Sequence, residues 1–183
     1  MVNVKVESTP NPATMKFLPG GPVLEEGTAN FASPDAAESS TLARRLFGIE
    51  GVRGVFFGSD FISVAKSEGA DWLDLETAVA SAISTHFEAG LPVVEAAEEE
   101  EDDTDVEDAV VARIRELIDN RIRPSVALDG GDIIFRSFDD GIVRVSLRGA
   151  CAGCPSSAGT LKMGVENLLR HYVPAVQAVE AAD

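Results

Sequence analysis

The chain of 183 residues contains two cysteines, Cys151 and Cys154, and both lie in the stretch RGACAGCPSS. The Cys-x-x-Cys spacing places two thiols where they can bind a metal, exchange electrons as a dithiol and disulfide, or form an inert loop. Small residues at Ala150, Ala152 and Gly153 surround them, so we expect the sulfur atoms to be accessible. The spacing by itself leaves all three chemistries open.

The cysteine loop immediately precedes a predicted helix that starts at Pro155, Ser156 and Ser157. A helix N-terminus presents unpaired backbone N–H groups, which favour negative charge and therefore thiolates. Zinc and iron-sulfur centres normally take four protein ligands, and one chain brings two thiolates. Two chains related by a two-fold axis would together supply four.

Other charged residues contribute little to a site within one chain. His86 lies across an acidic segment from the thiols, and His171 lies near the far end of the predicted helix, several turns away at ~1.5 Å per residue. Arg148 and Lys162, on either side of the cysteine loop, are candidates to stabilise the negative charge of a bound cluster. Solvated surface charge is the more ordinary role for both.

Two alternatives to a cluster site are a thiol-disulfide oxidoreductase and a structural zinc module. A thioredoxin-like fold carries further strands and a substrate-facing proline after the motif-bearing helix, whereas only VPAVQAVEAAD follows Tyr172. This placement favours ligation of a metal or a cluster over redox chemistry.

The charge distribution divides the chain. The formal net charge is −16, and residues 95–108 carry ten acids and no base. Such a block repels itself and buries no apolar area. We therefore predict a first domain over residues 1–94, an acidic linker over 95–104 and a second domain over 105–183.

Composition also excludes several classes of function. The negative charge disfavours nucleic acid, and no apolar run reaches the ~20 residues that cross a bilayer. The start MVNVKVESTP lacks the features of a secretory or transit signal, and two cysteines fit a reducing compartment. We expect a cytoplasmic protein with no nucleic-acid or membrane partner.

The first domain is predicted to form a small, mostly antiparallel sheet with about two helices. Strands are expected in VNVKVES and TMKFLP and in the two halves of GVRGVFFGSDFISVAK. Helices are expected over SPDAAESSTLARRLFG, which starts at Ser33 and Pro34, and over DWLDLETAVASAISTHFEAG. The stretch LPVVEA is compatible with an edge strand.

The second domain is predicted in the order αββαβ, so that the fold class is α+β with two small domains. Thr104 and Glu107 form a capping box for a helix that Pro124 closes. The strands IIFRSF and IVRVSL follow, and Asp140-Gly141 between them suits the positive φ angles of a tight hairpin. The second strand runs into the cysteine loop, and AVQAVEA returns as the last strand.

Two short motifs are interpreted first as turns. In TPNP, two prolines flank an asparagine, although exposed turns often make contacts as well. In Asp129-Gly130-Gly131-Asp132, two glycines between acids favour a tight turn, so we do not include this motif in the site.

Both halves resemble one family. IRPSVALDGGDIIF followed by RGACAGCPSSAGTLKMGVENLL resembles the C-terminal domain of the NifU/Nfu iron-sulfur scaffold proteins, and ESTPNPATMKFLPG resembles the N-terminal domain of the Nfu type. The resemblance covers nearly the whole chain. It implies a carrier, not an enzyme, in which Cys151 and Cys154 of two subunits jointly hold a labile 4Fe-4S cluster for transfer to apo-proteins.

The resemblance also implies partners. These are an upstream iron-sulfur scaffold and apo iron-sulfur client proteins, which we expect the first domain to recognise, and a second copy of the chain when the cluster is bound. The central two-iron ferredoxin-like domain of full-length NifU is missing, which favours housekeeping delivery over a dedicated nitrogenase role.

Overall fold

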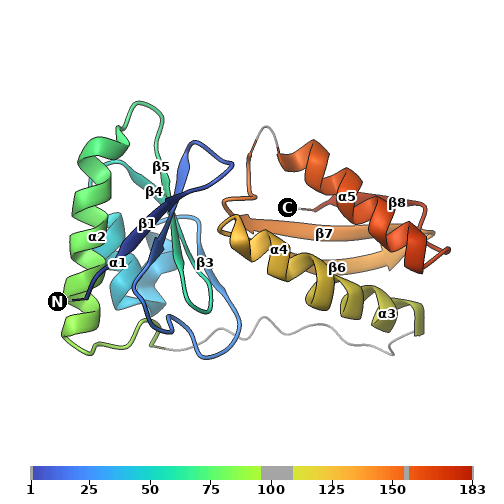
Figure 1. Cartoon of the computed structure of the whole chain (residues 1–183), viewed down its shortest axis with the longest axis horizontal. Coiled ribbons are helices and arrows are strands. Elements are labelled where there is room, and N and C mark those ends of the chain that lie inside the picture. The colour runs from blue at the N-terminus through green and yellow to red at the C-terminus, as the bar shows by residue number, and fades with distance from the viewer. Residues whose placement is uncertain (1, 96–108, 155–156, 183) are drawn as a thin grey trace.

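The computed structural model describes residues 2–95, 109–154 and 157–182. Two lobes lie side by side, one built from the N-terminal half and the other from the C-terminal half of the chain (Figure 1). The predicted linker over 95–104 lies outside the described residues except for Glu95, as does the predicted capping box at Thr104 and Glu107. The proposed domain limits therefore stay predictions.

The first lobe contains a five-stranded antiparallel sheet in the order β1-β2-β5-β4-β3. Both predicted hairpins are confirmed, since β1 pairs with β2 and β4 pairs with β5. The edge strand β3 was not predicted, because three residues are too few to show an alternating pattern. The strands are β1 (Lys5–Ser8), β2 (Thr14–Leu18), β3 (Ala29–Phe31), β4 (Val52–Phe57) and β5 (Ile62–Lys66).

The helices of the first lobe cover one face of its sheet (Figure 1). Helix α2 (Trp72–Glu88) has the predicted apolar stripe: Leu75, Val79 and Ile83 are buried, and the last two belong to the first core. Asp71 caps this helix by accepting a hydrogen bond from the backbone N–H of Leu73.

The single helix predicted from Ser33 to Gly48 is wrong in detail. A short 3₁₀ helix, η1 (Asp35–Ser39), is followed by α1 (Thr41–Phe47). Ser40 between them is extended, and its Oγ accepts a hydrogen bond from the N–H of Ala43 at 3.0 Å. This cap starts a new helix, and a residue cannot be extended and continue the preceding helix at the same time.

The edge strand with which LPVVEA is compatible does not form in its described part, residues 91–95. Val93 and Val94 pack, partly buried, against the first core, and the carbonyl of Val93 accepts a hydrogen bond from the Ser40 hydroxyl. A side chain satisfies this backbone group, so the segment needs no neighbouring strand.

The second lobe contains a three-stranded sheet in the order β6-β7-β8, which confirms the predicted αββαβ arrangement. Strands β6 (Gly131–Asp139) and β7 (Ile142–Gly149) form a hairpin whose turn residues Asp140 and Gly141 have φ of 49° and 82°. These are the left-handed angles that an Asp-Gly turn requires. Helix α5 (Ser157–Tyr172) crosses over to β8 (Ala178–Ala181), which pairs parallel to β7.

The helical segment before β6 continues past Pro124, so the prediction that it closes there is wrong. Helix α3 (Ala109–Leu117) passes into a π-helical turn, η2 (Ile118–Ile122), and then into α4 (Arg123–Leu128). Pro124 stands in the first turn of α4. A proline is tolerated there because the wider turn before it changes the hydrogen-bond register, and its absent N–H needs no partner.

Each lobe has its own apolar core. The first includes Phe17, Leu42 and Ile62, and the second includes Ile133, Val145 and Leu169 together with Cys151. None of the helices that the structure describes is long and apolar enough to span a membrane.

Candidate metal centre

Both cysteines lie in the loop that connects β7 to α5. Gly149, the last residue of β7, and Gly153 in this loop have φ of 62° and 67°, angles that other residues rarely adopt. The two thiols line one cavity of about 450 Å³, whose other lining residues come mainly from η2, α4, α5 and, at Pro10, the first lobe. The fold therefore brings together the two side chains that the sequence indicated, while their role as ligands stays a prediction.

The expectation that the sulfur atoms are accessible is wrong for this arrangement. Cys151 is 5% exposed and Cys154 is 2% exposed. Cys151 packs within the second core, and the Sγ of Cys154 lies 3.8 Å from the carbonyl oxygen of Pro10 in the TPNP turn of the first lobe. The small side chains beside Cys154 do not make its sulfur accessible, because the first lobe covers it.

The expectation that the loop favours a thiolate is wrong for Cys151. The pKa of the Cys151 thiol is raised to about 12, mainly by burial and also by the nearby charges of Asp129, Cys154 and Asp132. Loss of water and adjacent carboxylates outweigh the partial positive charge of the helix N-terminus. A protonated thiol is a poor nucleophile, but it loses its proton when it coordinates a metal.

The motif from Asp129 to Asp132 lies directly beside the thiols, where sequence reasoning did not place it. A Cβ on Gly131 would lie 2.5 Å from the Sγ of Cys151 and 2.8 Å from the carbonyl oxygen of Arg148. The N–H of Ala150 donates to the carbonyl of Gly130 at 3.1 Å. The signal was present, because successive glycines indicate a close backbone approach as well as a turn.

Asp132 anchors the start of β6 under this loop. Its two carboxylate oxygens accept hydrogen bonds from Nε and Nη2 of Arg123, both at 2.9 Å. The hydroxyl of Thr28 in the first lobe donates to the same carboxylate at 3.1 Å. A buried carboxylate held by a planar guanidinium is geometrically well defined, so the adjacent glycines are held in position.

The cationic residues near the thiols differ from those expected. In the described part of the chain, neither Arg148 nor Lys162 lines the cavity, and Lys162 is exposed on α5. Arg121 of η2 does line it, with its guanidinium 5.0 Å from the ring centre of Tyr172. Sequence reasoning missed Arg121, because a contact between η2 and α5 has no local signal.

The histidines lie apart from the thiols. His86 is buried in α2 with its Nε2 3.2 Å from the carbonyl oxygen of Pro92, and His171 packs against Tyr172 near the end of α5. Within residues 2–95, 109–154 and 157–182, no group of three or more His, Cys, Asp or Glu side chains could hold a metal ion. The two thiols therefore have no third ligand from the described part of their own chain.

Comparison with known families assigns both lobes. The model for the scaffold protein Nfu/NifU N-terminal domain matches residues 4–90, and the model for the NifU-like domain matches residues 114–180. The solution structure of a NifU-like protein from Saccharomyces cerevisiae gives a TM-score of 0.48 at 20% identity, covering 54% of this chain and 87% of that one.

Curated relatives cover nearly all of the sequence. A human protein named "NFU1 iron-sulfur cluster scaffold homolog, mitochondrial" is 50% identical over 179 residues, which are 97% of this chain and 70% of that protein. Proteins of the same name from Drosophila willistoni and Drosophila persimilis are 48% and 47% identical over 180 residues. The matches cover 97% of this chain and 62% and 64% of the fly proteins. The chain belongs to the Nfu/NifU family of scaffold proteins.

Proposed function

We propose that the chain is an iron-sulfur cluster scaffold and carrier, which holds a labile 4Fe-4S cluster between two subunits and transfers it to apo-proteins. The cluster is cargo that passes through the protein. The observation that carries the proposal is the pair of thiols, Cys151 and Cys154, which line one cavity without a third ligand from the described part of the chain.

The donor set fits half of a cluster site. A 4Fe-4S cluster is usually held by four cysteine thiolates, so two copies of this loop supply the full number. Because each copy contributes two ligands, the bound cluster loses half of them when the two subunits separate. Such a site releases its cargo more readily than one enclosed by a single chain, which is what a carrier needs.

The chain's own residues position the thiols for this role. Gly131 lets β6 lie against Cys151, and the pair of Arg123 and Asp132 holds the start of that strand. Transfer would proceed by exchange of ligands, in which client thiolates replace Cys151 and Cys154 one at a time. Such exchange requires no general acid or base, in keeping with the naming of the relatives as scaffolds.

The redox alternative is disfavoured by the environment of Cys151. Thiol-disulfide oxidoreductases depend on a thiol whose pKa is lowered, whereas burial raises the pKa of Cys151 to about 12. A structural zinc module would again require ligands beyond the two thiols.

Anaerobic reconstitution tests the proposal. Purified reduced protein supplied with iron and sulfide should bind about four iron and four sulfide per dimer, with the mass of a dimer in solution. Cys151→Ala and Cys154→Ala should each abolish this binding, whereas Met163→Ala, at an exposed position on α5, should retain it. A colourless monomer after reconstitution would contradict the proposal.

The same experiment separates the alternatives. A structural zinc module predicts tightly bound zinc whose removal unfolds the second lobe. An oxidoreductase predicts disulfide reduction without any metal.

The proposed partners follow from the carrier role. They are an upstream cluster donor, apo-protein clients recognised by the first lobe, and a second copy of the chain. The cytoplasmic location stays a prediction, and the human and fly relatives are named as mitochondrial proteins.

A further inference from the structure

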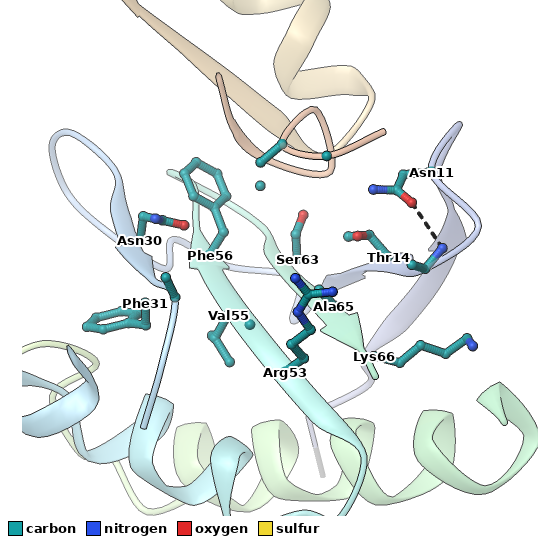
Figure 2. Close-up of a pocket in the computed structure, with 16 residues that line it drawn as sticks. Asn11, Thr14, Asn30, Phe31, Arg53, Val55, Phe56, Ser63, Ala65 and Lys66 are labelled. Carbon is teal, nitrogen blue, oxygen red and sulfur yellow. Dashed lines mark hydrogen bonds between the residues drawn. The ribbon is translucent and has the colours of Figure 1, made fainter. Parts of the chain in front are cut away.

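One face of the first sheet is turned away from its own helices and toward the second lobe. Figure 2 shows Phe56 and Ser63 on this face, opposite the helices, directed toward the neighbouring loop. Phe56 is buried but belongs to neither lobe's core, and its Cδ1 would lie 3.0 Å from a Cβ on Gly149. A large apolar side chain is therefore buried by contact between the lobes.

Polar side chains of the first lobe bond backbone carbonyls of the second. The Nδ2 of Asn11 donates to the carbonyl of Ala150 at 3.1 Å, and the hydroxyl of Ser63 donates to the carbonyl of Gly130. The Nζ of Lys16 lies 3.2 Å and 3.4 Å from the last carbonyls of α4, those of Ala127 and Leu128. A cation at the C-terminal end of a helix is electrostatically favoured.

The burial of these donors shows that the contact is specific. Asn11 is 5% exposed, Lys16 is 7% exposed and Ser63 is 1% exposed. Burying an amide, an ammonium or a hydroxyl is unfavourable unless it is hydrogen-bonded, and each of these has its partner in the other lobe. We call these three residues, together with Phe56, the docking face.

The TPNP turn directs Asn11 toward the cysteine loop. The Oδ1 of Asn11 accepts a hydrogen bond from the N–H of Ala13 at 3.0 Å, which leaves Nδ2 free to reach Ala150, the residue before Cys151. The adjacent carbonyl of Pro10 lies against the Sγ of Cys154. The turn therefore covers one thiol while it binds the backbone next to the other.

We propose that the docking face is a binding surface for the cysteine loop of its own chain, and that it competes with a second subunit for that loop. The inference rests on the proposed scaffold function only in naming the competitor. A cluster shared by two chains requires the sulfur of Cys154 to face the partner's thiols. In this structure the carbonyl oxygen of Pro10 lies against that sulfur instead, and Pro10 lines the same cavity as both thiols. The metal-free chain is thus closed, and loading of a cluster opens it.

Alkylation of the metal-free protein tests the closed arrangement. The reduced full-length chain is treated with iodoacetamide at fixed pH, and fragment-ion mass spectrometry assigns the label to Cys151 or Cys154. Iodoacetamide should label Cys154 about tenfold faster in Asn11→Ala and in Lys16→Met than in the wild type. Loss of one such hydrogen bond raises the fraction of undocked chains by about this factor. Cys151 should respond less, because it also packs within the second core.

Matched variants serve as controls. Lys66→Met removes an ammonium from the adjacent strand of the same sheet, but its partner is the carbonyl of Ala70 within the first lobe. Asn30→Ala removes an exposed amide from the edge strand β3. In both variants, iodoacetamide should label Cys154 at the wild-type rate.

Wild-type labelling rates in folded Asn11→Ala, Lys16→Met and the double variant would overturn the proposal. Small-angle X-ray scattering of the unaltered metal-free chain supplies a test that does not depend on any variant. A compact profile matching the two docked lobes is expected, and a profile of separated lobes would also overturn the proposal.

The outcomes distinguish this inference from the scaffold function, because both measurements use protein without iron. Faster labelling of Cys154 in a chain that then binds no cluster would support the docking face and contradict only the scaffold function. Unchanged labelling in a chain that does bind a cluster would contradict the docking face alone.

Discussion

The two lobes use their sheets in different ways. The first sheet buries one face under α1 and α2 and presents donors such as Asn11 and Lys16 on the other side. The second lobe instead presents backbone carbonyls at the end of α4 and beside the ends of its strands, together with a loop that contains both thiols. Side-chain identity therefore decides what the first lobe binds, whereas close backbone packing decides the geometry of the second.

The largest effect that would sharpen this comparison is expected at Gly131. Gly131→Ala should destabilise the second lobe by about 3 kcal/mol, because its Cβ meets both Cys151 and the backbone of Arg148. Gly159→Ala, in α5 with no atom within 4 Å of the added Cβ, should instead stabilise by about 0.5 kcal/mol.

Unfolding in denaturant, followed by circular dichroism, measures both glycine variants. Trp72 is the sole tryptophan and lies in the first lobe, so its fluorescence should report a smaller change. Equal stability of the two variants would show that the close packing of β6 against the loop is not needed.

An intermediate effect is expected at the Arg123–Asp132 pair. Arg123→Met should lower the free energy of unfolding by about 2 kcal/mol, because it leaves the buried Asp132 carboxylate without its two strongest donors. Arg144→Met removes a guanidinium whose partners, Asp139 and Glu180, are both exposed, and should change stability by less than about 0.5 kcal/mol. Similar losses from both arginines, measured by chemical denaturation, would argue against a special role for Asp132.

The smallest effect concerns pH and the first lobe. Burial lowers the pKa of His86 below its usual 6.5, and the charge of Arg45 lowers it further, although the bond to Pro92 opposes this. The stability that the neutral imidazole contributes is therefore fully present above about pH 6.5. It is lost as the pH falls below this value, because His86 takes up a proton at a higher pH in the unfolded chain than in the folded one. As the pH falls from about 6.5 to 5.5, the stability of the first lobe, followed by Trp72 fluorescence, should decrease in the wild type and decrease less in His86→Gln. An equal pH dependence in both proteins would assign the effect to other groups.

Local patterns predicted most of the secondary structure. The Asp140-Gly141 turn and the apolar stripe of α2 are properties of short segments, so they were identifiable from residue order. The errors occur where a contact or a backbone geometry that the residue pattern does not show replaces a local rule. Ser40 caps a second helix and bonds Val93, and Pro124 follows a π-helical turn instead of ending the segment.

The candidate site was predictable in its chemistry but not in its environment. Cys151 and Cys154 were evident from their type and spacing, and the family resemblance pointed to the same two thiols. Their burial, the approach of Gly131 and the contribution of Arg121 to the cavity depend on segments that are distant in sequence. Nothing in the order of residues around a thiol reports which other backbone packs on it.

The amino-acid sequence by itself determined the two thiols, the αββαβ order of the second lobe and the hairpins of the first. It did so because residue type, turn chemistry and apolar periodicity act over a few neighbouring residues. Only the tertiary structure decided that the TPNP turn covers Cys154 and that Asn11, Lys16 and Ser63 bond the second lobe. Burial and hydrogen bonding between residues more than 60 positions apart are set by how whole sheets pack, so they leave no trace in a local pattern.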